Sequence, residues 1–319
     1  MTRPVYLAIV LTCGMFAVGC QQKPDEQGKA AAPQTSVVVV TSQVALEATK
    51  ELAGSHYDVL KVVPGSTVSR LWTPESQDVK VMQKASLIFL QGAGYDPWKD
   101  RASLPGSRVT DLSRGIYDDF IRIPDAVTHQ HGPEGKHSHP GTVWATWLNP
   151  ELLLPQISTI ETALAKKKPD AADEISKAAA VLRSQIQSQT EKIQALRTSL
   201  NGRKISLMAD NSNYLYLAKA LGLECRYLHW PESGDLSEEQ LQEFQKLQEQ
   251  TPDEGLRVFL LDARQSASTR TMIDKAGFRL VQIDLCESGA SHSGEKQTNE
   301  SVWKRLAGNL ERLSAALQP

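Results

Sequence analysis

Short apolar runs alternate with segments of helical spacing along the first part of the chain. Three runs have the length and apolar character of buried parallel strands: SVVVVTS (36–42), HYDVLKVVP (56–64) and SLIFLQG (86–92). Between them, residues 43–54 and 73–85 carry apolar positions at helical spacing, and Thr73 is the expected N-cap of the second helix. The order strand, helix, strand, helix, strand predicts an α/β lobe built on a parallel sheet.

The same alternation returns after residue 202. Four further strand-like runs are KISLMAD (204–210), LECRYLHW (223–230), RVFLLDA (257–263) and FRLVQIDL (278–285). Segments with a helical pattern separate them at 213–221, 237–249 and 266–276. The chain therefore predicts a second α/β lobe that follows the first without obvious sequence repetition.

One long helical pattern lies between the two predicted lobes. From Pro169 onward, apolar residues recur at Ile175, Ala179, Leu182, Ile186, Ile193, Leu196 and Leu200. The pattern covers about thirty residues, or roughly 45 Å at 1.5 Å per residue. A surface coiled-coil helix is the alternative, but the lobes on both sides favour a backbone helix that joins them. We expect an α/β fold with lobes at 37–150 and 203–319, and linking helices at 151–202.

The first twenty residues have the pattern of a bacterial lipoprotein leader. Arg3 precedes an apolar run from Val5 to Val18, which is too short to span a bilayer. The run ends in FAVGC (16–20), which resembles a lipobox, so we expect a signal peptide over 1–19 and lipidation at Cys20. An ordinary signal peptide with an incidental cysteine is the alternative.

A polar segment follows the leader. Residues 20–36 are rich in Pro, Ala and Gln and have no apolar period, which indicates a flexible tether. We therefore expect a protein outside the cytoplasm, lipid-anchored to the cell membrane, on the periplasmic face or at the cell surface. Of the cysteines after the leader, Cys225 and Cys286 each end an apolar run, so we expect them to be unpaired, with a disulfide between them as the alternative.

Charge and motif content exclude several classes of function. The net charge is −2, with 35 Lys and Arg against 37 Asp and Glu, so the sequence has no electrostatic footprint for nucleic acid. It contains no His-Glu-x-x-His, no Gly-x-Ser-x-Gly and no phosphate-binding glycine loop. We therefore do not expect an enzyme.

The stretch THQHGPEGKHSHPG (128–141) holds four of the seven histidines. They form two His-x-His pairs, His129 with His131 and His137 with His139. Residues i and i+2 of an extended segment point to the same side, and Gly132–Gly135 has turn chemistry, so a hairpin-like reversal would gather the four imidazoles. Four protein ligands leave no open position, which suits capture of zinc, with copper and nickel also compatible. Solvated loop histidines that chelate weakly are the alternative.

The other histidines, His56, His229 and His292, lie singly, and we expect surface or hydrogen-bonded roles for them. Trp144 and Trp147 follow the histidine-rich loop, and we expect them to pack on the hinge side of the first lobe.

Five short motifs occur in the order in which they occur in a known family. They are Pro64-Gly65 followed by WTP (72–74), QGAGYDPW (91–98), TWLNP (146–150), YLAKALGLE (216–224) and LVQIDL (280–285). With the lipobox, the two lobes and the long helix, the chain resembles the zinc- and manganese-type substrate-binding lipoproteins of ABC importers. The resemblance covers almost the whole chain after the leader. It implies a receptor that binds metal between two α/β lobes.

The departures from this family concern the metal ligands. The resemblance implies three histidines and one carboxylate, but the histidine positions fall at about Ser69, Ala145 and Asn211, and only the carboxylate, Asp284, remains. One carboxylate, one amide and one hydroxyl make a poor zinc site. We therefore expect the loop histidines to bind the metal at the mouth of the cleft, with Asp284 as a fifth or substitute ligand.

The sequence thus predicts a lipid-anchored receptor that captures zinc, or a similar divalent metal such as copper, nickel or manganese. The expected partners are an ABC permease and its ATPase, and the receptor is expected to be a monomer. The alternative is a degenerate solute-binding lipoprotein that buffers metal, or binds another ligand or a protein, without transport.

Overall fold

The computed structural model describes residues 36–64, 72–123, 141–231, 235–252, 254–262, 264–288 and 300–318. They belong to one compact unit, Thr35–Pro319. The predicted leader, the lipidation site Cys20 and the histidine-rich loop lie outside the described residues. None of the helices in the described ranges combines the length and the apolar character needed to cross a membrane.

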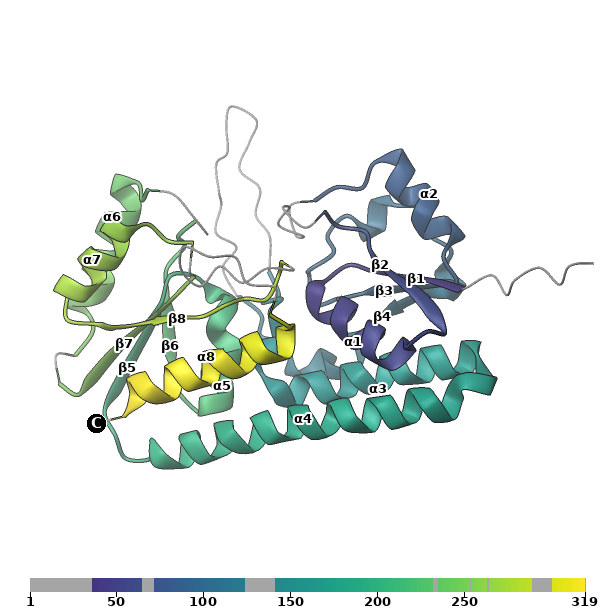
Figure 1. Ribbon diagram of the computed structural model, residues 1–319. Coiled ribbons are helices and arrows are strands. Elements are labelled where there is room, and N and C mark those ends of the chain that lie inside the picture. The colour runs from purple at the N-terminus through teal and green to yellow at the C-terminus, as the bar shows by residue number, and fades with distance from the viewer. Residues whose placement is uncertain are drawn as a thin grey trace, which may run out of the picture. The chain divides into compact units, whose positions relative to one another are not determined.

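The first lobe is built on a four-stranded sheet (Figure 1). Its strands are β1 (Ser36–Val40), β2 (Tyr57–Lys61), β3 (Leu87–Leu90) and β4 (Val109–Asp111). They pair in the order β2-β1-β3-β4, and every pairing is parallel. The three strands expected from the sequence are confirmed. β4 was not expected, because three residues are too few to show an apolar period.

Helices α1 (Gln43–Ala53) and α2 (Ser76–Lys84) connect the first three strands. The prediction that Thr73 caps α2 is wrong, because the N-cap is Glu75. The Glu75 backbone N–H donates to Asp78 Oδ2 at 2.8 Å, and this capping box makes the helix begin after Glu75.

The second lobe repeats this strand arrangement. Its strands are β5 (Ile205–Ala209), β6 (Cys225–Tyr227), β7 (Leu256–Leu261) and β8 (Arg279–Gln282), paired in parallel in the order β6-β5-β7-β8. Its helices are α5 (Leu215–Leu221), α6 (Glu238–Glu249) and α7 (Ala267–Lys275). The predicted second α/β lobe is therefore confirmed.

Two helices in sequence join the lobes, α3 (Pro150–Lys167) and α4 (Ala172–Ser199). α4 is 28 residues long, or about 42 Å at 1.5 Å per residue. It packs against α3, against α1 of the first lobe and against α5 of the second. A last helix, α8 (Val302–Leu317), also lies on it (Figure 1). The long backbone helix is confirmed.

Short 3-10 helices complete the described elements: η2 (Lys99–Arg101), η3 (Gly106–Arg108), η4 (Arg114–Asp119), η5 (Thr146–Leu148), η6 (Pro169–Ala171) and η7 (Ser212–Tyr214). The largest hydrophobic cluster is continuous through both lobes. It contains Val38 and Phe89 of the first sheet, Ile186 of α4, and Leu207 and Leu260 of the second sheet. Because burial of apolar area is the main stabilising term, this shared core resists separation of the lobes.

Candidate functional site

The carboxyl ends of parallel strands are where open α/β sheets commonly place ligands, and polar side chains gather there in the second lobe. Asp210 follows β5 and is fully buried. Its Oδ2 accepts the backbone N–H of Asp262 at 3.0 Å and Nε2 of Gln265 at 3.3 Å, and its Oδ1 accepts Nδ2 of Asn211 at 2.8 Å. Burial raises the pKa of Asp210 to about 7. This carboxylate therefore organises the loops that follow β5 and β7.

Asp262, directly after β7, belongs to a second group of charges. Arg264 donates Nε to Asp262 Oδ1 at 2.8 Å and Nη2 to Oδ2 at 2.9 Å. The same Nη2 lies 3.8 Å from Oε2 of Glu287. Burial lowers the pKa of Lys61, at the end of β2, and the nearby charge of Glu287 opposes this shift. Acidic and basic side chains therefore lie near one another at the ends of β2 and β7.

The predicted ligand Asp284 lies just beyond β8, with its side chain 10% exposed. Arg305 of α8 donates Nη2 to Oδ1 at 2.6 Å and Nε to Oδ2 at 2.9 Å. The backbone N–H of Cys286 also donates to Oδ1, at 2.8 Å. A metal ion would have to compete with a two-point charged hydrogen bond for this carboxylate.

Arg305 is itself fixed by its surroundings. Its side chain is 1% exposed, and Nη1 donates to the carbonyl oxygen of Ser288 at 2.6 Å. Burial works against its charge, but the bond to Asp284 and the nearby acidic groups outweigh burial and raise the pKa of Arg305. Asn309, one turn later on α8, accepts the N–H of Asp284 and donates to its carbonyl oxygen, both at 2.8 Å. α8 therefore holds Asp284 by both side chain and backbone.

Sequence reasoning missed Arg305. A signal for it exists, because the buried positions of α8 follow a helical stripe that includes Val302, Asn309 and Leu313, and Arg305 falls on that stripe. A basic residue on an apolar stripe implies a buried acidic partner.

The other positions that the family resemblance pointed to lie as follows. Ala145 is buried, and Asn211 uses Oδ1 to accept the N–H of Asn213 at 2.9 Å as the N-cap of η7. Ser69 lies outside the described residues. Within the described parts of the chain, no group of three or more His, Cys, Asp or Glu side chains is arranged to hold a metal ion.

The four loop histidines, His129, His131, His137 and His139, lie outside the described residues, but the segments that flank their loop are described. The N–H of Ile123 donates to the Gly141 carbonyl oxygen, and the N–H of Val143 donates to the Ile121 carbonyl oxygen, each at 2.9 Å. With the antiparallel bridge between Arg122 and Thr142, these contacts form a stem from which residues 124–140 leave and to which they return.

The second lobe holds this stem. The N–H of Ile121 donates to the hydroxyl of Tyr216 in α5 at 3.0 Å. Val143 and Tyr216 also share a small buried cluster with Ile116 and Leu152. The stem of the histidine-rich loop thus packs against α3 and α5.

The QGAGYDPW turn after β3 needs its glycine. Gly92 has a φ of 77°, and a Cβ there would lie 2.0 Å from Oδ1 of Asp111, so another side chain does not fit. The turn places Tyr95 against Trp144 and Trp147, with ring centroids 5.3 and 5.5 Å away. Trp147 Nε1 donates to the carbonyl oxygen of Leu285 at 2.9 Å. We expected both tryptophans on the hinge side of the first lobe; Trp147 reaches the loop after β8, and Trp144 packs beside it.

Two single histidines each have a hydrogen-bonding partner, as we expected. Nε2 of His56 lies 2.8 Å from Oε2 of Glu174, and Nδ1 of His229 lies 2.9 Å from Oε1 of Glu243. His292 lies outside the described residues. Cys225 and Cys286 are free thiols, as predicted.

Comparison with known proteins agrees with this architecture. A sequence model of the family described as "Zinc-uptake complex component A periplasmic" matches residues 38–316. The zinc-binding lipoprotein AdcA of Streptococcus pneumoniae (strain ATCC BAA-255 / R6) is 23% identical over 228 residues, which are 70% of this chain and 43% of AdcA. The manganese ABC transporter substrate-binding lipoprotein PsaA of Streptococcus pneumoniae is 21% identical over 303 residues, or 88% of each protein. The chain thus spans less than half of the length of AdcA.

Solved structures share the fold. The Zn(II)-bound ZnuA-like domain of Streptococcus pneumoniae AdcA is similar with a TM-score of 0.68 at 19% identity, covering 88% of this chain and 98% of that domain. The metal-dependent lipoprotein YcdH from Bacillus subtilis is similar with the same TM-score and identity, over 88% of this chain and 98% of YcdH. The predicted α/β fold of two parallel-sheet lobes on a long helix is confirmed.

Proposed function

Since the chain belongs to the family of the zinc-uptake complex component A, periplasmic, we propose that it captures zinc or a similar divalent metal outside the cytoplasm and delivers it to an ABC importer. The observation that carries this proposal is the family match over residues 38–316, which includes both lobes and the joining helices. The relatives AdcA and PsaA are named for zinc and manganese, respectively, and each is named a lipoprotein. The receptor acts as a monomer, anchored through Cys20, with a permease and an ATPase as its partners.

The metal is held chiefly by the imidazoles of His129, His131, His137 and His139. Asp284 already has a buried guanidinium partner, and Ala145 offers no ligand atom. The stem between Ile121–Ile123 and Gly141–Val143 supports this assignment, because it brings the two ends of the loop side by side. Neutral imidazole suits zinc, and copper and nickel are also compatible.

Asp284 serves as a fifth or substitute ligand only when the metal displaces Arg305. Breaking a buried ion pair costs about 3–5 kcal/mol, so this exchange requires a tightly bound metal. Coordination by the loop histidines does not require the displacement of Arg305 from Asp284.

The second candidate is a degenerate receptor that buffers metal, or binds another ligand or a protein, without transport. The Asp284–Arg305 pair favours it, because the remaining family carboxylate has a partner within the protein.

Zinc affinity, measured on the full chain by competition with a chelator, tests the proposal. Replacing His137 and His139 together by alanine should abolish high-affinity binding and change the free energy of unfolding by no more than about 0.5 kcal/mol, as for other surface substitutions. Asp284→Asn should retain most of the affinity. His229→Ala is the matched control, because it removes a histidine that pairs with Glu243.

The opposite pattern contradicts the assignment. Equal zinc affinity in the wild type and the double variant leaves weakly chelating loop histidines as the explanation. Loss of affinity in Asp284→Asn alone, in a variant that unfolding measurements show to be folded, places the metal on Asp284.

A further inference from the structure

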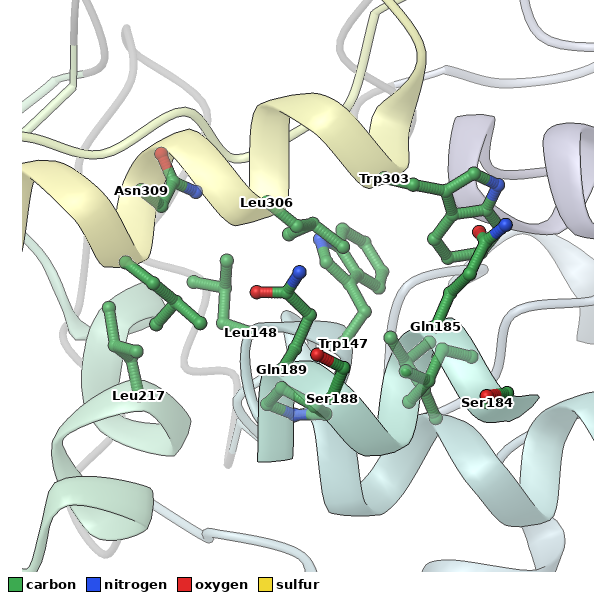
Figure 2. A pocket seen from close by; sticks show the side chains of 14 residues that line it. Trp147, Leu148, Ser184, Gln185, Ser188, Gln189, Leu217, Trp303, Leu306 and Asn309 are labelled. Carbon is green, nitrogen blue, oxygen red and sulfur yellow. The ribbon is translucent and has the colours of Figure 1, made fainter. Parts of the chain in front are cut away.

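A cavity of about 470 Å³ lies between α4 and α8, where no function has been assigned (Figure 2). Residues of η5 and α3 close it on one side. Its volume falls within the range of about 300–1,000 Å³ that is usual for small-molecule sites.

The two long walls of the cavity differ in chemistry. The α8 wall is mostly apolar and contains Trp303, Leu306 and Leu310. The α4 wall carries four neutral polar side chains: Ser184, Gln185, Ser188 and Gln189. Residues four apart lie on one face of a helix, so these side chains form a polar strip opposite the apolar wall. Figure 2 shows the Gln189 amide pointing from α4 toward Leu306 and the Gln185 amide beside Trp303.

The polar groups on the other walls already have partners. Trp147 Nε1 donates to the Leu285 carbonyl oxygen, and Trp303 Nε1 donates to Glu51 Oε1 at 2.5 Å. Asn309 is engaged with the backbone of Asp284. These residues therefore present only their packing surfaces to a ligand.

Gln189 differs from them. Its Oε1 is buried, and within the part of the chain that the structure describes it accepts no hydrogen bond. Because Oε1 has almost no accessible surface, the side chain must turn for this oxygen to meet a ligand hydroxyl or amide, and the new hydrogen bond would remove the cost of the unpaired acceptor. After this turn, the carbonyl oxygen of Gln189 offers an acceptor to a ligand donor.

None of the described residues that line the cavity is charged. A charged group that faces the apolar wall would lose hydration there without gaining an opposite charge. The cavity is therefore also unsuited to a metal ion, and it is distinct from the proposed metal ligands.

We propose that this cavity binds an uncharged small molecule with one apolar face and hydroxyl groups along the opposite edge. The apolar face packs on Trp303, Leu306 and Leu310, and one hydroxyl donates to Gln189 Oε1. This site does not depend on metal binding, so it stands or falls separately from the proposed transport function.

The probe for this site is 4-nitrophenyl β-glucoside, which has a flat apolar ring and several hydroxyls. Isothermal titration calorimetry on the full chain measures the binding, which should saturate at one site per chain. The matching glucuronide, which differs by a carboxylate, should bind at least tenfold more weakly.

Two single variants of α4 locate the binding. Ser188→Trp places an indole in the cavity and should weaken binding at least tenfold. Gln187→Trp adds the same residue at the neighbouring exposed position, which does not line the cavity, and should bind like the wild type. If Ser188→Trp fails to fold, Gln189→Leu replaces it, with an expected loss of roughly fivefold from the missing acceptor.

Three results would overturn the proposal. The first is an absence of a saturable heat of binding in the wild type up to about 10 mM of the glucoside. The second is equal affinity for the glucoside and the glucuronide. The third is binding by a folded Ser188→Trp or Gln189→Leu variant that matches Gln187→Trp.

Discussion

Asp210 ends β5 with a buried carboxylate whose pKa burial raises to about 7. The pKa of a free aspartate is about 3.9, so between about pH 4 and pH 7 the folded protein binds a proton here that the unfolded chain releases. The contribution of Asp210 to stability is therefore greatest below about pH 4 and decreases as the pH rises to about 7. Asp96, in the QGAGYDPW turn, behaves similarly, because burial raises its pKa to about 6.

The substitution Asp210→Asn should remove the part of the pH dependence of stability that comes from Asp210. The variant loses stability at pH 5, because the amide cannot reproduce all the hydrogen bonds of the carboxyl group. From pH 5 to pH 8, the difference in free energy of unfolding between the wild type and the variant should shrink by at least about 1 kcal/mol. Each unit of pKa shift corresponds to about 1.4 kcal/mol. Urea unfolding at both pH values measures this difference, in which the Asp96 contribution cancels.

Asp58→Asn is the control for this measurement, because Asp58 is exposed on β2. Its effect on unfolding should change less between the two pH values than that of Asp210→Asn. An equal pH trend in the two variants would show that Asp210 does not carry the effect.

At the scale of elements, α5 fixes the stem of the histidine-rich loop. Tyr216→Phe removes the hydroxyl that accepts the Ile121 N–H, and should lower the free energy of unfolding by about 1 kcal/mol. If the loop binds zinc, a loosened stem should also lower zinc affinity. Chemical unfolding and chelator competition measure the two effects separately.

Tyr117→Phe provides the matched control for this change. Tyr117 belongs to neighbouring η4, and its side chain is mostly exposed. Its hydroxyl should be dispensable for both stability and zinc affinity. If the two variants have the same stability, the Tyr216 hydroxyl does not hold the stem.

For the whole molecule, protons distinguish a site of imidazoles from a site built on a carboxylate. A histidine with a pKa of about 6.5 is roughly 90% neutral at pH 7.5 and about 10% neutral at pH 5.5. Each imidazole ligand should therefore weaken apparent zinc affinity about tenfold over this interval, and four ligands on the order of ten-thousand-fold. Competition with a chelator of known pH dependence measures the loss. A loss below about tenfold excludes a site of four histidines.

Local pattern determined most of the elements. The runs at 36–42, 86–92 and 204–210 contain β1, β3 and β5, and the apolar stripe from Ile175 to Leu200 predicted α4, because strand and helix periods are properties of neighbouring residues. The order of the short motifs also predicted the family, which the match over residues 38–316 confirmed. The histidine cluster is visible in the sequence, but its role as a ligand set stays a prediction.

Only the tertiary structure decided the contacts around the predicted ligand Asp284. Its pairing with Arg305 joins residues 21 positions apart, and Tyr216 meets Ile121 across 95 positions. No local period encodes such contacts, because they exist only after α8 and α5 have packed on the sheets and the long helix. The cavity between α4 and α8 has the same origin, since its apolar wall and its polar strip face each other only in the folded chain.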